Sequence, residues 1–169
     1  MDVEVKIFQS IAIMEFLEDK FPAPSLLPSD HSSRARVRAL ANMIACDIHP
    51  LNNLRVRLYL VDEMNVTEEN RQAWISHWIH IGFQAYEKNL VNCEEIGLYS
   101  HGNHPTMADV CLIPQIANAR LNKVDLSNFP LILQVEERCQ AHPAFKKALP
   151  SCLLYTSDAA DERSSVDLG

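Results

Sequence analysis

Two polar residues lie between a short stretch of alternating apolar and polar residues and a segment with apolar residues at helical spacing. Gln9 and Ser10 follow the β-branched segment at residues 3–8 and precede apolar residues at helical spacing. A helix N-terminus offers free backbone N–H groups and a partial positive charge, which suit a carboxylate. The Ser10 hydroxyl adds a donor, and the Gln9 carbonyl can accept from an ammonium group. The pair suits the zwitterionic end of an amino acid or peptide; the alternative is that Ser10 only caps the helix.

A second group of polar side chains surrounds Pro50 within a long helical pattern. His49 and Asn53 are four residues apart, so they share one face of a helix. At about 100° per residue, Arg55 falls close to the apolar stripe that contains Ile44. A buried unpaired charge is very costly, so an arginine there needs an acidic partner or a ligand. Since Pro50 disturbs the helical phase, the alternative is that Arg55 extends to solvent.

Other residues with possible chemistry are weaker candidates. His77 and His80 are three residues apart, but no third ligand of a suitable type stands nearby, so no metal site is predicted. Cys111 lies in an apolar helical pattern and is predicted to be a small buried hydrophobe, not a nucleophile. No C-x-x-C pair and no secretory signal accompany the cysteines, which predicts reduced thiols in a cytoplasmic protein. The five cysteines are Cys46, Cys93, Cys111, Cys139 and Cys152.

The overall composition narrows the class of protein. The chain has 169 residues, of which 47% are hydrophobic and 22% charged, a balance typical of a folded globular chain. No apolar run approaches the ~18 residues that a membrane-spanning helix needs. The net charge of −7, without any block of Lys or Arg, argues against nucleic acids and anionic membranes as partners.

The elements that must position these residues are mainly helical. One strand is predicted over residues 3–8, followed by a helix over 11–20 that Ser10 caps. Three prolines over 21–28 predict an extended connector. A long helical pattern then covers residues 30–64, and Pro50 should kink it or split it in two.

Further helices follow this long pattern. One begins at residues 67–69 and carries the stripe Trp74, Trp78, Gly82, Tyr86 and Leu90. Thr106 and Asp109 predict a capping box that opens a buried helix over 110–121. Two more helices should begin at Phe129-Pro130 and at Pro143.

The C-terminal segment at residues 152–169 differs from the rest of the chain. It has no apolar period and follows the sequence Pro150-Ser151, which is typical of the end of a helical segment. It resembles the translation of a sequencing adapter, and the alternative is an ordinary disordered tail. We therefore exclude it from the prediction of the fold.

Four motifs together resemble the maleylacetoacetate isomerases, the zeta class of glutathione transferases. They lie at residues 9–13, 47–56, 106–115 and 123–126, and the resemblance extends over nearly all of residues 3–150. The Thr-x-x-Asp element within the third motif is shared by many glutathione transferases, whereas the segment from His49 to Arg55 is diagnostic of the zeta class.

The resemblance implies an all-helical C-terminal domain preceded by a thioredoxin-like domain. In this chain the first domain is reduced to its last strand and helix at residues 1–21, followed by a linker at 22–29. The helical domain spans 30–151, and 152–169 form the non-native tail. The Ser-Cys segment with which the family holds the glutathione thiol lies before Met1, so no catalytic residue is predicted in this chain, and the 169 residues alone are expected to have little activity.

The resemblance also implies glutathione as the cofactor and assigns its contacts. Positions matching Gln9 and Ser10 bind its γ-glutamyl end. Four further positions line the same site: His49, Asn53, Leu54 and Arg55. The family commonly places a substrate-binding arginine where this chain has Leu121, so the neighbouring Arg120 is the candidate here.

The implied reaction is the cis–trans isomerisation of maleylacetoacetate to fumarylacetoacetate in phenylalanine and tyrosine catabolism, carried out by a cytoplasmic homodimer. The thiolate of glutathione adds to the double bond, the bond rotates, and elimination restores the alkene. Two alternatives share the residues of this chain: a non-catalytic helical binding module and a zeta-class transferase that acts on α-halo acids.

Overall fold

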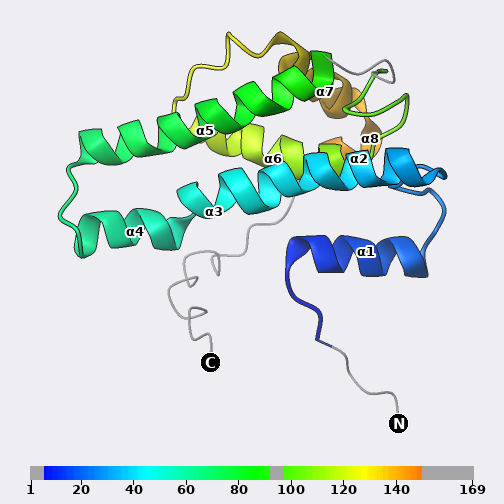
Figure 1. Ribbon diagram of the computed structural model, residues 1–169, viewed down its shortest axis with the longest axis horizontal. Helices are drawn as coiled ribbons and strands as arrows, with labels where there is room; N and C mark the ends of the chain where they lie inside the picture. Colours follow the sequence, from blue (N-terminus) through cyan, green and yellow to red (C-terminus); the bar gives the residue numbers. More distant parts are fainter. Residues whose placement is uncertain (1–5, 92–96, 150–169) are drawn as a thin grey trace.

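The computed structural model describes residues 6–91 and 97–149, and every regular element in these ranges is helical (Figure 1). Residues 6–8 have no regular structure, and the rest of the predicted strand at 3–8 lies outside the described residues, as do Cys93 and the segment 152–169. The helices are α1 (Ser10–Lys20), α2 (His31–Asn42), the π-helix η1 (Met43–Ile48), α3 (His49–Asn52), α4 (Leu54–Asp62), α5 (Glu68–Val91), α6 (Met107–Leu121), α7 (Pro130–Ala141) and α8 (Pro143–Lys147).

A bundle of α2 to α7 contains the hydrophobic core. The α2–η1–α3 rod packs against α5 and α6, and α7 packs against both α5 and α6 (Figure 1). The predicted starts of α5, α6, α7 and α8 are confirmed within two residues. In the described ranges, no helix combines the length and apolarity needed to cross a membrane. The largest fully buried apolar side chains include Leu40, Ile48, Ile75, Ile79, Phe83, Leu90, Leu112 and Ile116.

The buried stripe of α5 differs from the predicted one at its beginning. Ile75 and Ile79 are completely buried, whereas Trp74 and Trp78 are only partly buried. The Trp74 indole N–H donates to the carbonyl of Leu51 at 2.7 Å, so this ring needs a position at the edge of the core. The stripe therefore begins one residue later than the tryptophans suggested, although Tyr86 is buried as predicted.

Pro50 neither kinks nor splits the helix in the way the sequence suggested. It lies in the first turn of α3, where a missing N–H is tolerated, directly after the π-helical turn of η1. The break comes three residues later at Asn53, whose backbone is extended (φ −72°, ψ 164°). The Asn53 side-chain oxygen accepts from the N–H of Val56 at 3.1 Å and so caps α4.

A buried polar network fixes the start of α6. Thr106 and Asp109 form the predicted capping box, and the Thr106 N–H donates to the Asp109 carboxylate at 2.7 Å. The Ser100 N–H donates to the other carboxylate oxygen at 2.9 Å, and the Tyr86 hydroxyl donates to that of Ser100. Burial raises the pKa of Asp109 even though these donors lower it.

Helix α1 lies antiparallel to α2 on one flank of the bundle (Figure 1). The Arg38 guanidinium binds both oxygens of Glu15, at 2.6 and 2.9 Å. One turn further along α1, the buried Glu18 accepts from Ser25 and Leu26 of the connector. Met14 is buried toward the bundle, while three other apolar side chains of α1 remain exposed: Ile13, Phe16 and Leu17.

Candidate functional site

The start of α1 presents backbone donors to which no side chain among the described residues forms a capping bond. Gln9, not Ser10, is the N-cap residue, and it adopts a left-handed backbone (φ 72°, ψ 122°). The prediction that Ser10 caps the helix is therefore wrong, because Ser10 is already helical and its side chain makes no capping bond. A non-glycine residue at positive φ costs about 1–3 kcal/mol and commonly marks a functional site. Both side chains are exposed, so the N–H groups and the Ser10 hydroxyl are accessible.

The second half of the site is the break between α3 and α4. His49 and Arg55 are exposed, and Leu54 exposes 39% of its surface beside the capping residue Asn53. The side-chain oxygen of Asn53 already accepts from the N–H of Val56, so the side-chain amide nitrogen of Asn53 is the group left to donate to a ligand. Within residues 6–91 and 97–149, no carboxylate forms an ion pair with Arg55. The guanidinium reaches solvent, which was the alternative to burial, and it is available to an anion.

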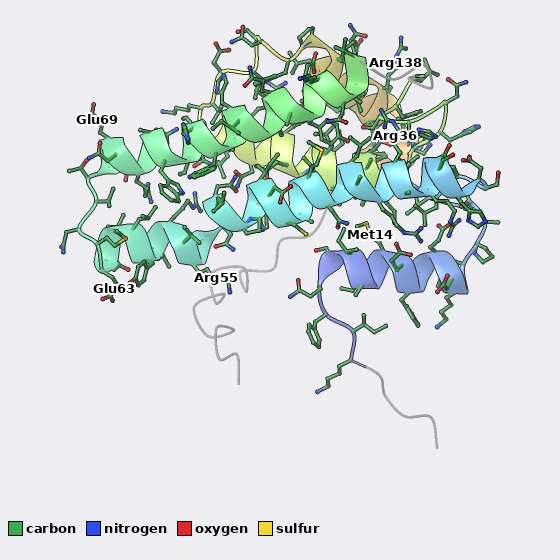
Figure 2. The ribbon with its side chains drawn as sticks, in the orientation of Figure 1. Met14, Arg36, Arg55, Glu63, Glu69 and Arg138 are labelled. Carbon is green, nitrogen blue, oxygen red and sulfur yellow. The ribbon has the colours of Figure 1, made fainter. Side chains whose placement is uncertain are left out.

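The antiparallel register brings the start of α1 to the same side of the rod as this break. Glu15 lies opposite Arg38, and at 1.5 Å per residue Ile11 lies opposite Asn42. Gln9 and Ser10 therefore lie beside the beginning of η1. In Figure 2, Arg55 is on the side of the α2–α4 row that α1 covers. The predicted residues thus form two groups on one side of the molecule.

Arg120 does not join either group. Its guanidinium binds both carboxylate oxygens of Glu136 on α7, at 3.0 and 2.5 Å, and the Glu136 side chain is only 8% exposed. This pair raises the pKa of Arg120, because the hydrogen bonds favour the charged form. Binding a substrate carboxylate here would leave Glu136 unpaired and nearly buried. The adjacent Leu121 is 78% exposed.

The histidines of α5 make ring contacts instead of metal contacts. His77 stacks edge-on against Trp78, and His80 lies 5.2 Å from the ring of Phe129. In the described part of the chain, no group of three or more His, Cys, Asp or Glu side chains could hold a metal ion.

Cys46 lies on η1, and the sequence analysis did not single it out as a site residue. Its Sγ contacts the side-chain oxygen of Asn42 at 3.9 Å, and Asn42 is one turn beyond Arg38, which binds α1. The thiol is exposed.

Curated relatives match most of the chain, although no protein-family model matches it. The chain is 46% identical over 145 residues to the maleylpyruvate isomerase of Ralstonia sp, a match that covers 86% of this chain and 68% of the relative. It is 43% identical over 150 residues to a probable maleylacetoacetate isomerase of Vibrio cholerae, covering 89% and 69%.

Solved structures agree with these relatives. The holo structure of a maleyl pyruvate isomerase, described as a bacterial glutathione S-transferase of the zeta class, superposes with a TM-score of 0.88 at 43% identity, covering 92% of this chain and 74% of that one. A maleylacetoacetate isomerase of Anaeromyxobacter dehalogenans, solved with GSH bound in its active site, gives a TM-score of 0.82 at 36% identity, covering 88% and 67%.

Proposed function

The chain belongs to the family of maleylacetoacetate and maleylpyruvate isomerases, the zeta class of glutathione transferases, and from that premise we propose that it serves the glutathione-dependent isomerisation of a maleyl-substituted acid. The substrate we propose is maleylacetoacetate, converted to fumarylacetoacetate in phenylalanine and tyrosine catabolism. The curated relatives and the solved neighbours carry names of this activity.

The two exposed polar groups fit opposite charges of a peptide cofactor. The free N–H groups of α1 and the Ser10 hydroxyl suit a carboxylate, while the Gln9 carbonyl suits an ammonium group. Arg55 supplies a cation without an acidic partner in the described ranges, and Asn53 supplies an N–H donor beside it. His49 and the half-exposed Leu54 complete the proposed surface for glutathione.

Glutathione, when bound, supplies a thiol nucleophile for the carbon–carbon double bond. The residues of this chain bind and orient its peptide portion, and orientation alone can lower a barrier by several kcal/mol. The exposed apolar side chains of α1, Ile13, Phe16 and Leu17, support the proposal that residues 1–21 belong to a thioredoxin-like domain.

We also propose the division into a linker at 22–29 and a helical domain at 30–151, a homodimeric assembly and a cytoplasmic location. The connector between α1 and α2 contains three prolines, which supports the boundary. The partly exposed residues Met43, Trp78 and Ile81 line a shallow hollow between η1 and α5, and this surface supports contact with a second copy.

The observation that carries the proposal is the uncapped start of α1 on the same side of the rod as Arg55. The test is a chimera that joins this chain to the part of the Ralstonia relative that the match leaves uncovered. It should isomerise maleylacetoacetate only when glutathione is present. Arg55→Ala should raise the KM for glutathione about tenfold, because a charge-assisted hydrogen bond contributes about 1.5–3 kcal/mol. A folded chimera that binds glutathione and never isomerises this substrate would contradict the proposal.

A further inference from the structure

Gly82 lies where α5 packs directly against the last residue of η1. A Cβ atom added to Gly82 would overlap the Cγ1 and Cδ1 atoms of Ile48. Ile48 is 1% exposed and β-branched, so its side chain is confined by the core and stiff at χ1. A larger residue at position 82 would therefore force the two helices apart or drive Ile48 out of its place.

A second contact from α5 holds the following turn. The Trp74 indole N–H, two turns before Gly82 on α5, donates to the carbonyl of Leu51 at 2.7 Å. The two contacts thus hold the rod on either side of His49. Beyond its neighbours in the chain, α3 packs mainly against α5. The buried side-chain amide of Asn52 adds no support, because it has no hydrogen-bond partner among the described residues.

The other face of this turn carries residues of the proposed glutathione site. Ile48 and Asn52 are four residues apart and both buried, so they form the inner face. His49 and Asn53 each follow one of them in the chain, and they are exposed and half-buried, respectively. Asn53 also caps α4, the helix that presents Arg55. A displacement of Ile48 is therefore transmitted to the proposed binding surface.

We propose that Gly82 and Trp74 are positioning residues for glutathione. Neither needs to touch the ligand: they fix the η1–α3 turn, and the turn places His49, Asn53 and Arg55. This inference rests on the proposed function, which assigns those three residues to glutathione. Hydrogen bonds weaken steeply when their geometry is disturbed, so a small shift of the turn lowers the affinity.

The test measures the binding of S-methylglutathione, which has no free thiol, and urea denaturation with the same full-chain variants. Gly82→Ala should lower the urea midpoint and weaken binding about tenfold. Phe83→Leu is the matched control, because Phe83 is a buried neighbour on α5 whose ring packs edge-on against Phe129, 5.7 Å away. It should also lower the midpoint, but leave the Kd within about twofold of wild type. Equal weakening in both variants would overturn the proposal.

A double substitution tests whether the contact with Ile48 is the cause. Ile48→Ala removes both overlapping atoms, and the Cβ that remains would lie 3.5 Å from a Cβ at position 82, an ordinary contact. Adding Gly82→Ala to Ile48→Ala should therefore change the Kd by no more than about twofold. A tenfold loss that persists in this background would contradict the proposal.

Trp74→Phe keeps the proposal testable if Gly82→Ala does not fold. It removes the N–H that binds the carbonyl of Leu51 and introduces no larger group. The expected loss of affinity is about threefold, corresponding to one neutral hydrogen bond. An unchanged Kd in this variant would overturn the role of the second contact.

Amide chemical shifts of the ligand-free chain separate this inference from the proposed function. Gly82→Ala should shift the amides of residues 48–53 and of Val56 in the cap of α4, whereas Phe83→Leu should not. If these amides shift but wild type does not bind S-methylglutathione, the positioning of the turn is supported and the proposed cofactor site fails. If wild type binds and the folded α5 variants bind equally tightly, only this inference fails.

Discussion

Helix α1 and the α2–α7 bundle are stabilised in different ways. The bundle buries continuous apolar stripes, so that Ile75, Ile79 and Phe83 of α5 are completely inaccessible to solvent. Helix α1 buries mainly Met14 and is held by polar contacts one turn apart, from Glu15 at its middle to Arg38 and from Glu18 near its C-terminal end to the connector. Much of its remaining apolar surface is exposed. Global stability therefore resides in the bundle, whereas the geometry of the proposed site depends on how α1 is attached.

The largest expected difference in stability is between two alanine substitutions, one of a phenylalanine in the bundle and one of a phenylalanine in α1. Phe83→Ala removes a ring with no exposed surface and should lower the free energy of unfolding by about 3–5 kcal/mol. Phe16→Ala removes a ring of α1 that is 43% exposed, and it should change that free energy by about 0.5 kcal/mol or less. Urea denaturation of both variants measures the difference. Equal losses would show that α1 is part of the cooperative core.

The next effect should come from the buried network at the start of α6. Asp109→Ala leaves the N–H groups of Ser100 and Thr106 without their acceptor and should cost about 2–4 kcal/mol. Since burial raises the pKa of Asp109, the contribution of this carboxyl is complete below its usual value of 3.8 and falls as the pH rises through the raised pKa. The difference between variant and wild type should therefore be largest in acid and narrow toward neutral pH, as measured by urea denaturation across that range. A difference that widens with pH would contradict the direction of the shift.

The smallest change in the free energy of unfolding should come from removing the Arg38–Glu15 ion pair, which holds α1 against α2. Arg38→Ala should cost no more than about 1 kcal/mol, because both side chains of the pair are partly exposed. Amide hydrogen exchange in residues 10–20 should nevertheless become faster, since α1 loses its contact with α2. Arg71→Ala is a matched control, because Arg71 pairs with Glu68 at the start of α5. If both variants accelerate exchange in α1 equally, the attachment described here is wrong.

The ion pair between Arg38 and Glu15 should also make the attachment of α1 to α2 weaken at acidic pH. The hydrogen bond from Arg38 lowers the pKa of Glu15, so this contribution is present above the usual value of 4.5 and is lost as the pH falls through the lowered pKa. The protection factors of the amides in α1, which are corrected for the intrinsic effect of pH on exchange, should fall in this acidic range in wild type and much less in Arg38→Ala.

Features controlled by local sequence could be predicted, whereas those that depend on distant partners could not. Thr106 with Asp109, and the prolines at 130 and 143, mark helix starts through contacts within one turn, and they were predicted correctly. The break at Asn53 was missed because a π-helical turn lets the chain continue through Pro50. The pairing of Arg120 could not be predicted because its partner, Glu136, lies on the next helix.

In the proposed site, too, the features that depend on packing could not be predicted from the sequence. The exposure of Arg55 was one of two alternatives from the sequence, and only the packing of α4 distinguishes them. The left-handed backbone of Gln9 has no sequence signal, since Gln is not a residue that favours this conformation. The assignment of Gln9, Ser10, His49, Asn53, Leu54 and Arg55 to glutathione stays a prediction.

The most direct test of the site is an NMR titration of the chain with S-methylglutathione, comparing wild type with Arg55→Ala and Arg138→Ala. Both arginines are exposed, and Figure 2 shows Arg138 on the other side of the α2–α4 row from Arg55. The account predicts shifts at the amides of Gln9, Ser10 and Asn53, with a Kd about tenfold weaker in Arg55→Ala and unchanged in Arg138→Ala. Binding that shifts other amides, or that the two substitutions weaken equally, would contradict it.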